Sequence, residues 1–336
     1  MSSQGLWVFV EHMDGEIAPV TFELLGKGRE LADELKTEVA AVLLGNNVRK
    51  LSEELFQYGA DKVYLIDDAV LQDYRTFPYA EGIVKLANKY RPEIILIGAT
   101  TLGRDLSGVI ATGLNTGLTA DCTELTVDAE KRQLFQTRPA FGGNLMATIL
   151  CRNYPQMATV RPRVFKFPDV NPKKGHIVEE KLGISEAEVP TKVLRREDEK
   201  GPGVYLDQTD VIVAGGRGLG SRENFRLVEE LADVLGGMVG ASRAAVEASW
   251  TSIHHQVGQT GQTVRPKLYI ACGISGAVQH LVGMQSSDVI VAINNDPQAP
   301  IFDVATYRIV GDASEILPVL INDFKQALSG RQVIGK

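Results

Sequence analysis

The sequence has few features of a secreted, membrane-spanning or nucleic-acid-binding protein. Its three cysteines, Cys122, Cys151 and Cys272, are odd in number and far apart, which argues against a disulfide framework and a zinc knuckle. The longest apolar runs have about six residues, whereas a helix needs about 20 to cross a bilayer. There is no long basic run and the net charge is −7, so we expect no membrane span and no nucleic-acid partner.

The start of the chain has no basic stretch ahead of an apolar one, so a secretory signal is not expected. The lack of a disulfide framework predicts a reducing compartment, the cytoplasm or an equivalent matrix. A length of 336 residues predicts two domains. Between residues 168 and 202 the chain is charged and punctuated by proline, with acids and bases nearly balanced. We expect an N-terminal α/β domain over 1–190, a linker over 191–206 and a C-terminal domain over 207–330.

The first half alternates segments of strand and helix character. Apolar runs at 6–10, 39–44, 62–66 and 94–98 predict strands, and the segments 19–36, 50–58 and 79–90 predict helices. This alternation predicts right-handed crossovers and a parallel sheet covered on both faces. After residue 117, four closely spaced segments at 119–127, 133–138, 145–151 and 157–164 predict an antiparallel strand extension.

The most informative part of the chain runs from residue 210 to residue 312. Strands are predicted at 211–214, 268–271 and 289–293, with one helix capped by Ser221 and another at 276–283. Most of these strands end in clusters of glycine and small polar residues, where the backbone can approach a phosphate or a ring closely. Five such clusters within about 100 residues indicate a large, extended cofactor.

The loop at 215–220 does not fit the pattern G-x-G-x-x-G, so it is a poor match to the NAD fingerprint. Two interpretations of its glycines remain open. They form a loop that binds phosphate, or they serve a tight strand-to-helix turn that needs glycine for its backbone alone. Arg217 lies inside this turn, where a guanidinium group points to the place that a phosphate or ring would occupy.

Ser275 and Gly276 follow a strand and open the predicted helix at 276–283. Free N–H groups at a helix start, beside a residue with no side chain, form a site for an anion such as a pyrophosphate. His280 lies about one turn further along the same face. The alternative for His280 is an ordinary helix histidine whose ring is satisfied within the fold.

Two polar pairs also have a functional and an ordinary interpretation. Ser242 and Arg243 stand at the top of a strand, where they contact a phosphate or ring, or simply cap a helix and face solvent. Gln259 and Thr260 lie between two glycines, where they present an amide and a hydroxyl to a ligand, or form a solvated turn.

Asp312 could cap the last helix. Pro318, however, is tolerated only near a helix start, because deeper in the helix it would clash with the preceding turn. This favours Ser314 as the cap and leaves Asp312 available for a ribose hydroxyl.

Short motifs occur along nearly the whole chain in one order. They are Thr116–Cys122, Arg138–Asn144, Met157–Pro162, Gly215–Gly218, Gly240–Ala245, Gln256–Gly261, Gly276–His280 and Ala299–Phe302. In this order and spacing they closely resemble the α-subunits of electron-transferring flavoproteins. The segments 249–255 and 168–205 match that family less well.

The resemblance implies that residues 207–330 form a flavodoxin-like domain that binds one FAD without a covalent bond. By motif, Arg243 lies against the isoalloxazine ring, Thr260 hydrogen-bonds near N5, and His280 reaches the O2 edge. Arg243 and a protonated His280 would stabilise negative charge on the reduced ring, most of all where water is excluded. The other implied contacts, to the ring, pyrophosphate and adenosine, are Arg217, Ser242, Ala244, Val257, Gly258, Gln259, Ser275, Gly276, Ala277, Val278, Gln279, Asn294 and Asp312.

The resemblance also implies partners. Residues 1–190 would pair with a homologous β-subunit that carries AMP or a second FAD. Similar proteins accept electrons from acyl-CoA dehydrogenase and pass them towards quinone. Others, in anaerobes, oxidise NADH and divide the electrons between a crotonyl-CoA-type acceptor and ferredoxin or flavodoxin, which is called electron bifurcation. This chain has no extra iron–sulfur cysteines, so any ferredoxin must be a separate protein.

Two other kinds of protein share some of these sequence features. One is a flavin- or NAD-dependent dehydrogenase that acts alone. Catalysis by such an enzyme needs an acid–base pair, and the sequence shows no credible pair near the glycine loops. The other is a nucleotide-binding subunit without redox activity, which would be colourless when purified.

Overall fold

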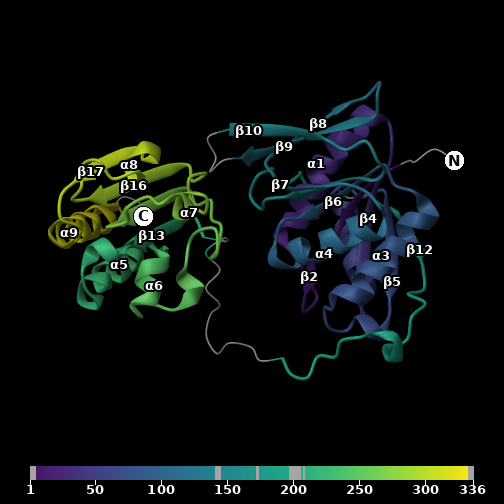
Figure 1. The fold of residues 1–336 in the computed structure, drawn as a ribbon, viewed down its shortest axis with the longest axis horizontal. Coiled ribbons are helices and arrows are strands. Elements are labelled where there is room, and N and C mark those ends of the chain that lie inside the picture. The colour runs from purple at the N-terminus through teal and green to yellow at the C-terminus, as the bar shows by residue number, and fades with distance from the viewer. Residues whose placement is uncertain (1–4, 141–144, 172–173, 197–205, 207–208, 332–336) are drawn as a thin grey trace. The chain divides into compact units, whose positions relative to one another are not determined.

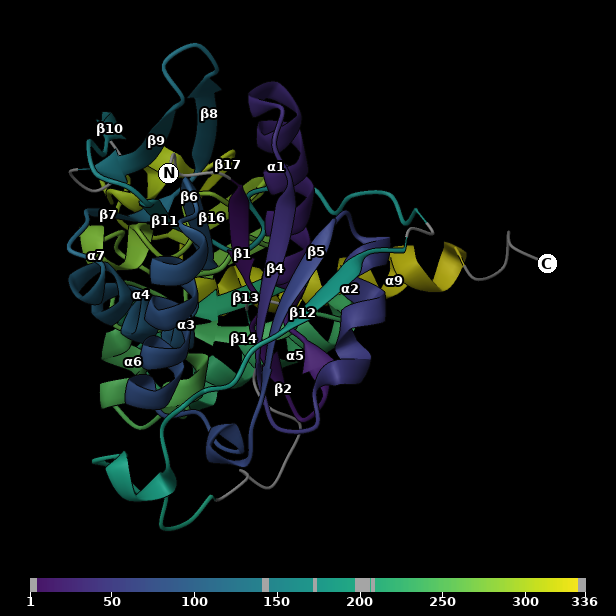
Figure 2. The ribbon, with the colours of Figure 1, turned by 90° about the vertical axis from the view of Figure 1, so that its right-hand side faces the viewer.

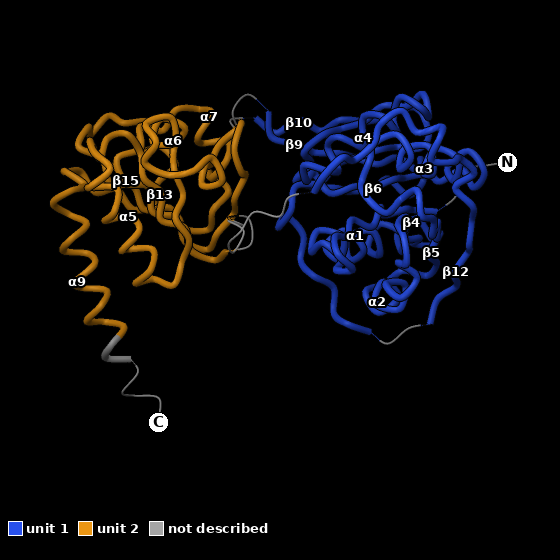
Figure 3. The backbone as a smooth tube through the Cα atoms, turned by 90° about the horizontal axis from the view of Figure 1, so that it is seen from below, with its two compact units in different colours: residues 1–197 blue, residues 198–336 orange. Residues whose placement is uncertain are grey.

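The computed structural model describes residues 5–140, 145–171, 174–196, 206 and 209–331. The chain forms two compact units, residues 1–197 and 198–336 (Figure 3). Most of the predicted linker, 191–206, lies outside the described residues, so the domain limits expected from the sequence stay predictions. Of its described residues, Arg196 is paired with Asp14 of the first unit and Leu206 is buried within the second.

The first unit is built on a seven-stranded sheet in which every neighbouring pair is parallel (Figures 1 and 2). The order is β12-β5-β4-β1-β6-β11-β7. The strands are β1 (Leu6–Phe9), β4 (Val39–Gly45), β5 (Lys62–Asp67), β6 (Ile94–Gly98), β7 (Leu118–Cys122), β11 (Gln156–Val160) and β12 (His176–Glu179). A short hairpin, β2 (His12–Met13) and β3 (Glu16–Ile17), follows β1.

Helices cover both faces of this sheet, as the runs of buried residues along β4 and β6 require. Helices α1 (Pro19–Leu35) and α2 (Ser52–Gln57) pack on one face, and α3 (Thr76–Tyr90) and α4 (Thr101–Gly113) pack on the other. The sequence-based prediction of an α/β fold with a parallel sheet is confirmed. Helix α4 was not predicted, because three glycines interrupt its apolar pattern.

The antiparallel extension is confirmed, but it has three strands and not four. These are β8 (Glu124–Asp128), β9 (Gln133–Ala140) and β10 (Leu145–Leu150), in the order β10-β9-β8. The predicted segment 119–127 is divided between β7 and β8, and the segment at 157–164 is β11. Both β7 and β11 belong to the parallel sheet, and all five residues of β11 are buried, as in a strand covered on two sides.

The second unit has a five-stranded parallel sheet in the order β14-β13-β15-β16-β17. Numbered from its first strand, this is 2-1-3-4-5, the flavodoxin-like order that the resemblance implies. The strands are β13 (Val211–Gly215), β14 (Met238–Ala241), β15 (Leu268–Cys272), β16 (Val289–Asn294) and β17 (Tyr307–Val310).

Helices α5 (Arg222–Leu235) and α9 (Ala313–Arg331) cover one face of the second sheet. The short helices α7 (Val278–Leu281) and α8 (Ile301–Val304) lie on the other, and α6 (Arg243–Glu247) follows β14 (Figure 1). Ser221 caps α5 as predicted, because its hydroxyl accepts a hydrogen bond from the N–H of Asn224. In the described part of the chain, no helix combines the length and apolar character needed to cross a membrane.

Candidate functional site

The sixteen residues predicted to form the site all lie at the carboxyl edge of the second sheet, or on loops that join it. The strand ends are in register, since Gly215 is paired with both Ala241 and Cys272, and Cys272 with Ile293. The chain order reverses between β13 and β15, and this switch point is where open parallel sheets bind their ligands. From β14 to β17 the edge spans four strand spacings, about 19 Å, which suits an extended ligand.

Hydrogen bonds between main-chain groups join these loops into one surface. The N–H of Ser242 donates to the carbonyl of Gly215 at 3.0 Å, and that of Gly218 donates to Gly273 at 3.0 Å. The N–H of Gln259 donates to the carbonyl of Gln279 at 2.7 Å. The loop at 256–262, which precedes β15, is thereby fixed beside the loop that follows β15.

The glycines of the first loop are explained by close packing of the backbone. A Cβ atom on Gly216 would lie 2.3 Å from the carbonyl oxygen of Gly273, and one on Gly218 would lie 2.6 Å from the same atom. Of the two interpretations left open by the sequence, the tight turn therefore accounts for these two glycines. Arg217 stands between them with an exposed side chain and is available to an external group.

Ser242 and Arg243 connect β14 to helix α6. The hydroxyl of Ser242 accepts a hydrogen bond from the N–H of Ala245 at 3.4 Å, so Ser242 is a helix cap in this structure. The Nε of Arg243 is 2.7 Å from Oε1 of Glu247, one turn further along α6. Both side chains are largely exposed, and Ala244 lies beside them in the same turn.

Thr260 lies at an exposed loop tip, but its hydroxyl is held in place. The amide nitrogen of Gln256 donates to the Oγ1 of Thr260 at 3.0 Å. Since Gln256 is buried, this hydrogen bond fixes the threonine and leaves the hydroxyl proton free to donate outward. Gln256 belongs to the motif Gln256–Gly261 but was not among the predicted site residues. Val257 and Gly258 complete the loop, and Gly258 has φ +142°, a conformation that favours glycine.

The sequence predicts a helix over 276–283, and this prediction is wrong in its length. Only α7, a single turn, is helical, because Gly276 has φ +88° and cannot continue a right-handed helix. A Cβ atom on Gly276 would lie 2.1 Å from the nitrogen of Ile301. Within the described chain, no hydrogen bond engages the backbone N–H groups of Ser275, Gly276, Ala277, Val278 and Gln279. These donors suit an anion.

His280 is buried, with 7% of its surface exposed, against strand β15. Its Nε2 lies 3.0 Å from the hydroxyl of Tyr269, while its Nδ1 is buried and has no hydrogen-bond partner among the described residues. Burial lowers the pKa of His280 to about 4, and the nearby carbonyl of Val257 offsets this only in part. The ring of the flavin-free chain is therefore neutral near pH 7, which does not support the expectation of a protonated His280.

The region predicted to contact an adenosine group differs from expectation at Asp312. Helix α9 begins at Ala313, and the Oδ1 of Asp312 accepts hydrogen bonds from the N–H and the hydroxyl of Ser314 at 2.8 and 2.7 Å. Asp312, not Ser314, is therefore the cap, and Pro318 lies inside the helix. These hydrogen bonds also lower the pKa of Asp312. Asn294 is buried and joins two loops, since its amide donates to the carbonyl of Ile274 at 2.9 Å.

Together these groups form a surface rich in hydrogen-bond donors. It combines two exposed guanidinium groups, a row of main-chain N–H groups, a fixed hydroxyl and a buried neutral imidazole. Such a set suits a ligand with a polyanionic linker and a polar ring. Among the described residues, no group of His, Cys, Asp and Glu is arranged to hold a metal ion.

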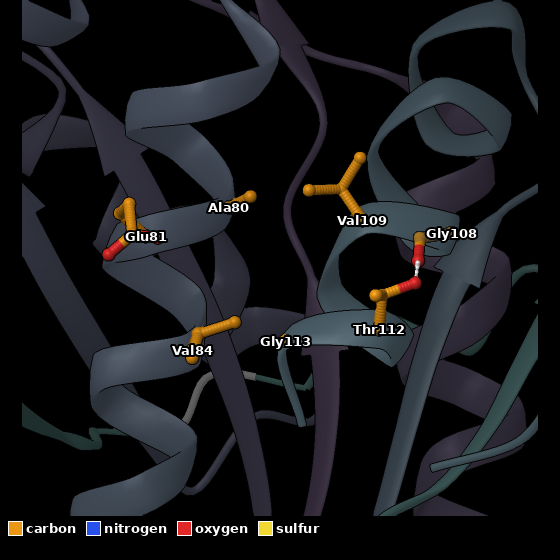
Figure 4. A pocket seen from close by; sticks show the side chains of 7 residues that line it. All are labelled: Ala80, Glu81, Val84, Gly108, Val109, Thr112 and Gly113. Atoms are coloured by element: carbon orange, nitrogen blue, oxygen red, sulfur yellow. Dashed lines mark hydrogen bonds between the residues drawn. The ribbon is translucent and has the colours of Figure 1, made fainter. Parts of the chain in front are cut away.

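A hollow of about 400 Å³ lies elsewhere, on the surface of the first unit between α3 and α4 (Figure 4). Ala80, Glu81 and Val84 line it from α3, and Val109 and Thr112 face them from α4. Its lining is mostly apolar and contains none of the predicted site residues. It is not part of the candidate site.

Two family models match the chain. The model described as "Electron transfer flavoprotein domain" matches residues 6–184, and the one described as "Electron transfer flavoprotein FAD-binding domain" matches residues 205–285.

Curated relatives match over nearly the full length. A protein named "Electron transfer flavoprotein subunit alpha" from Thermoanaerobacterium thermosaccharolyticum is 53% identical, over 96% of this chain and 98% of the relative. A protein of the same name from Clostridium acetobutylicum is 52% identical, over 96% and 98%. A protein named "Protein FixB" from Bradyrhizobium diazoefficiens is 53% identical, over 97% of this chain and 90% of the relative.

Proposed function

Because this chain belongs to the alpha subunits of the electron transfer flavoprotein family, we propose that its second unit binds one FAD and uses this cofactor to carry electrons. The observation that carries this proposal is the set of unpartnered donors at the switch point of a flavodoxin-like sheet. These are the N–H groups of 275–279 and the buried Nδ1 of His280. FAD, when bound, supplies the one-electron and two-electron redox chemistry.

The residues of the chain would bind and orient this group. Arg217 and the loop at 275–279 would hold the pyrophosphate, because guanidinium and main-chain N–H groups pair with phosphate oxygens. Ser242, Arg243 and Thr260 would lie along the ring, with Thr260 donating its free hydroxyl proton. Ala244 and Val257–Gly258 would pack against the ring, while Gln259 adds an exposed amide.

At the adenosine end, Asn294 would act chiefly by fixing the loop after β15, since its amide is already engaged with Ile274. Asp312 would offer its second carboxylate oxygen to a ribose hydroxyl while the first remains on Ser314. Arg243 would supply the positive charge beside the ring, because His280 is neutral.

The test of flavin binding is the spectrum of the purified full chain, alone and with its β-subunit. We expect flavin absorption and one FAD held by the second unit. Replacing Arg217 by Ala should weaken FAD retention, whereas replacing Arg226, an exposed arginine of α5, should not. Colourless protein that does not take up added FAD in either state would contradict the proposal.

For the partner, we propose a heterodimer with an electron transfer flavoprotein β-subunit, docked on the antiparallel extension of the first unit. Strand β10 is an edge strand, and its Leu145, Met146 and Leu150 are at least half exposed. An exposed apolar edge strand of this kind favours a covering partner. Sedimentation should show a 1:1 complex. Replacing Met146 by Lys should weaken it, and replacing the equally exposed Val319 of α9 should leave it intact.

We further propose that the complex accepts electrons from acyl-CoA dehydrogenase or, in the bifurcating mode, from NADH with delivery to ferredoxin or flavodoxin. Arg161 supports a second anionic group near the first unit. Its side chain is mostly buried, its Nε has no hydrogen-bond partner among the described residues, and its nearest carboxylate, Asp121, is 4.0 Å away. Burial lowers the pKa of Arg161, and the neighbouring charges of Arg104 and Arg138 act in the same direction.

The rest of the motif that follows Arg138, residues 141–144, lies outside the described residues. Flavin counting on the reconstituted heterodimer separates the two modes. Two FAD per dimer, with NADH oxidation that needs both a high-potential and a low-potential acceptor, would support bifurcation. One FAD with AMP, and no reaction with NADH, would leave transfer from a dehydrogenase. Substrate turnover by the chain alone would instead favour a stand-alone dehydrogenase.

A further inference from the structure

Tyr269 and His280 form a buried pair beneath the switch point. Tyr269 lies on β15, the central strand of the second sheet, and is fully buried. Its hydroxyl is 3.0 Å from Nε2 of His280, which follows 11 residues later on α7. Among the described residues this nitrogen is the only hydrogen-bond partner of the hydroxyl. A buried phenol is normally paired, so the contact determines where the protons of both rings lie.

The hydroxyl of Tyr269 keeps its proton, because burial raises the pKa of the phenol. That proton needs an acceptor, and a neutral imidazole offers one through the ring nitrogen that carries no hydrogen. If Nε2 carried the hydrogen instead, the phenol proton would be buried without an acceptor and Nδ1 would be a buried acceptor without a donor. A buried polar group without a hydrogen-bond partner destabilises the fold, so the arrangement with fewer such groups is favoured. With Tyr269 as the donor, only the Nδ1–H of His280 is left without a hydrogen bond among the described residues, although the carbonyl of Val257 lies near the ring.

We propose that Tyr269 is a positioning residue that donates to Nε2 of His280, fixes the ring hydrogen on Nδ1, and so presents a neutral N–H donor to the bound flavin. This inference rests on the proposed function for the identity of the ligand. In this role His280 acts as a neutral hydrogen-bond donor and not through a positive charge. A neutral donor stabilises an acceptor atom of the ring to a similar extent across the pH range above the pKa of His280.

The first experiment determines the tautomer without any flavin. Long-range ¹H–¹⁵N correlation spectra of the flavin-free, ¹⁵N-histidine-labelled chain should show His280 with its hydrogen on Nδ1. In Tyr269→Phe, which removes only the hydroxyl, that exclusive tautomer should be lost. Tyr307→Phe, at an exposed tyrosine of β17, is the control and should leave it unchanged. A wild-type ring with its hydrogen on Nε2, or an unaltered tautomer in Tyr269→Phe, would overturn the inference.

The second experiment measures the flavin potential in the reconstituted heterodimer. Tyr269→Phe should shift the equilibrium between oxidised and reduced flavin about fivefold towards the oxidised form, the worth of one hydrogen bond. In a His280→Ala background the same substitution should cause no further shift. An equal shift in both backgrounds would mean that Tyr269 acts only on the fold. If no flavin binds at all, the proposed function fails, while the tautomer result stands or falls by itself.

Discussion

Arg243 is ion-paired to Glu247, with its Nε 2.7 Å from Oε1, on the short helix that follows β14. The two side chains are 69% and 61% exposed, so the pair is weak, typically about 0–1 kcal/mol. Arg243 can therefore exchange Glu247 for another anion at little cost. In the proposed complex, Glu247 would compete with the flavin ring for the guanidinium group of Arg243.

The first prediction follows from this competition. Arg243→Ala should reduce the amount of one-electron-reduced, anionic flavin more than it weakens FAD retention, because one charge is removed while retention depends on many contacts. Stepwise reduction followed by absorption spectra measures the first quantity, and equilibrium dialysis measures the second.

Glu247→Gln is the matched variant and should act in the opposite direction. Freed from its carboxylate partner, Arg243 should favour the anionic flavin by up to about fivefold, the upper worth of an exposed ion pair. An Arg243→Ala protein that still accumulates the anionic form as the wild type does would contradict this role.

The second prediction concerns Gly276. Gly276→Ala should destabilise the second unit by roughly 2–5 kcal/mol, because the new methyl group meets the nitrogen of Ile301 and the backbone has φ +88°. Urea unfolding monitored by circular dichroism would measure the change.

Gly108 provides the opposite case on helix α4. Its Cβ position is free of contacts within 4 Å and its φ is not positive, so Gly108→Ala should stabilise the first unit by about 0.5–1 kcal/mol. Equal effects of the two substitutions would show that the crowding around Gly276 is not decisive.

The third prediction is a dependence on pH. The pKa of His280 is lowered from 6.5 to about 4 by burial, so the folded chain binds its proton less readily than the unfolded chain. Stability from the neutral ring is complete above pH 6.5 and is lost as the pH falls from 6.5 to about 4, by up to about 3 kcal/mol.

In His280→Gln, the decrease in unfolding free energy between pH 7 and pH 4 should be smaller than in the wild type. His254→Gln, at an exposed histidine, should retain the wild-type slope. Identical slopes in all three proteins would show that His280 does not titrate in this way.

The fourth prediction concerns Glu23, a buried carboxylate on α1. It accepts hydrogen bonds from the N–H groups of Arg163, Val164 and Phe165 at 2.9, 3.1 and 3.2 Å, which fixes the chain after β11. Burial raises its pKa despite these donors. Glu23→Gln places an NH₂ group, which cannot accept, against N–H donors, and should cost about 1–3 kcal/mol. Glu34→Gln, exposed on the same helix, should change the unfolding free energy by less than about 0.5 kcal/mol.

The sequence predicts much of the fold, because buried parallel strands are runs of apolar residues and glycine marks their carboxyl ends. It cannot show that β11 inserts beside β6, since a five-residue strand carries no sign of its neighbour. The caps show the same limit. Ser221 is followed by a strong amphipathic helix and was predicted, whereas Asp312 and Ser314 are both good caps and only geometry decides between them.

The candidate site likewise contains residues that the sequence reveals and residues that only the structure reveals. Arg217, Arg243 and Thr260 belong to glycine-rich motifs that the sequence displays. Gln256 and Tyr269 act through other side chains, and their importance depends on distances across loops and strands. Tyr269 in particular looks like any core aromatic until its hydroxyl is seen beside His280. Such residues become visible only when the hydrogen-bond partner of each buried polar atom is known.

The insertion of β11 between β6 and β7 also sets the order in which the first unit can be completed. Among the strands that the structure describes, β7 has β11 as its one neighbour in the sheet, so it cannot dock until residue 160 has been synthesised. The three antiparallel strands, which separate β7 from β11 in the chain, must therefore emerge while β6 still has an open edge. This long-range pairing is expected to form more slowly than the pairing of β4 with β5, which follow each other in the chain. Until β11 arrives, the growing chain exposes an unpaired apolar strand, and that interval is when the first unit is most prone to aggregate.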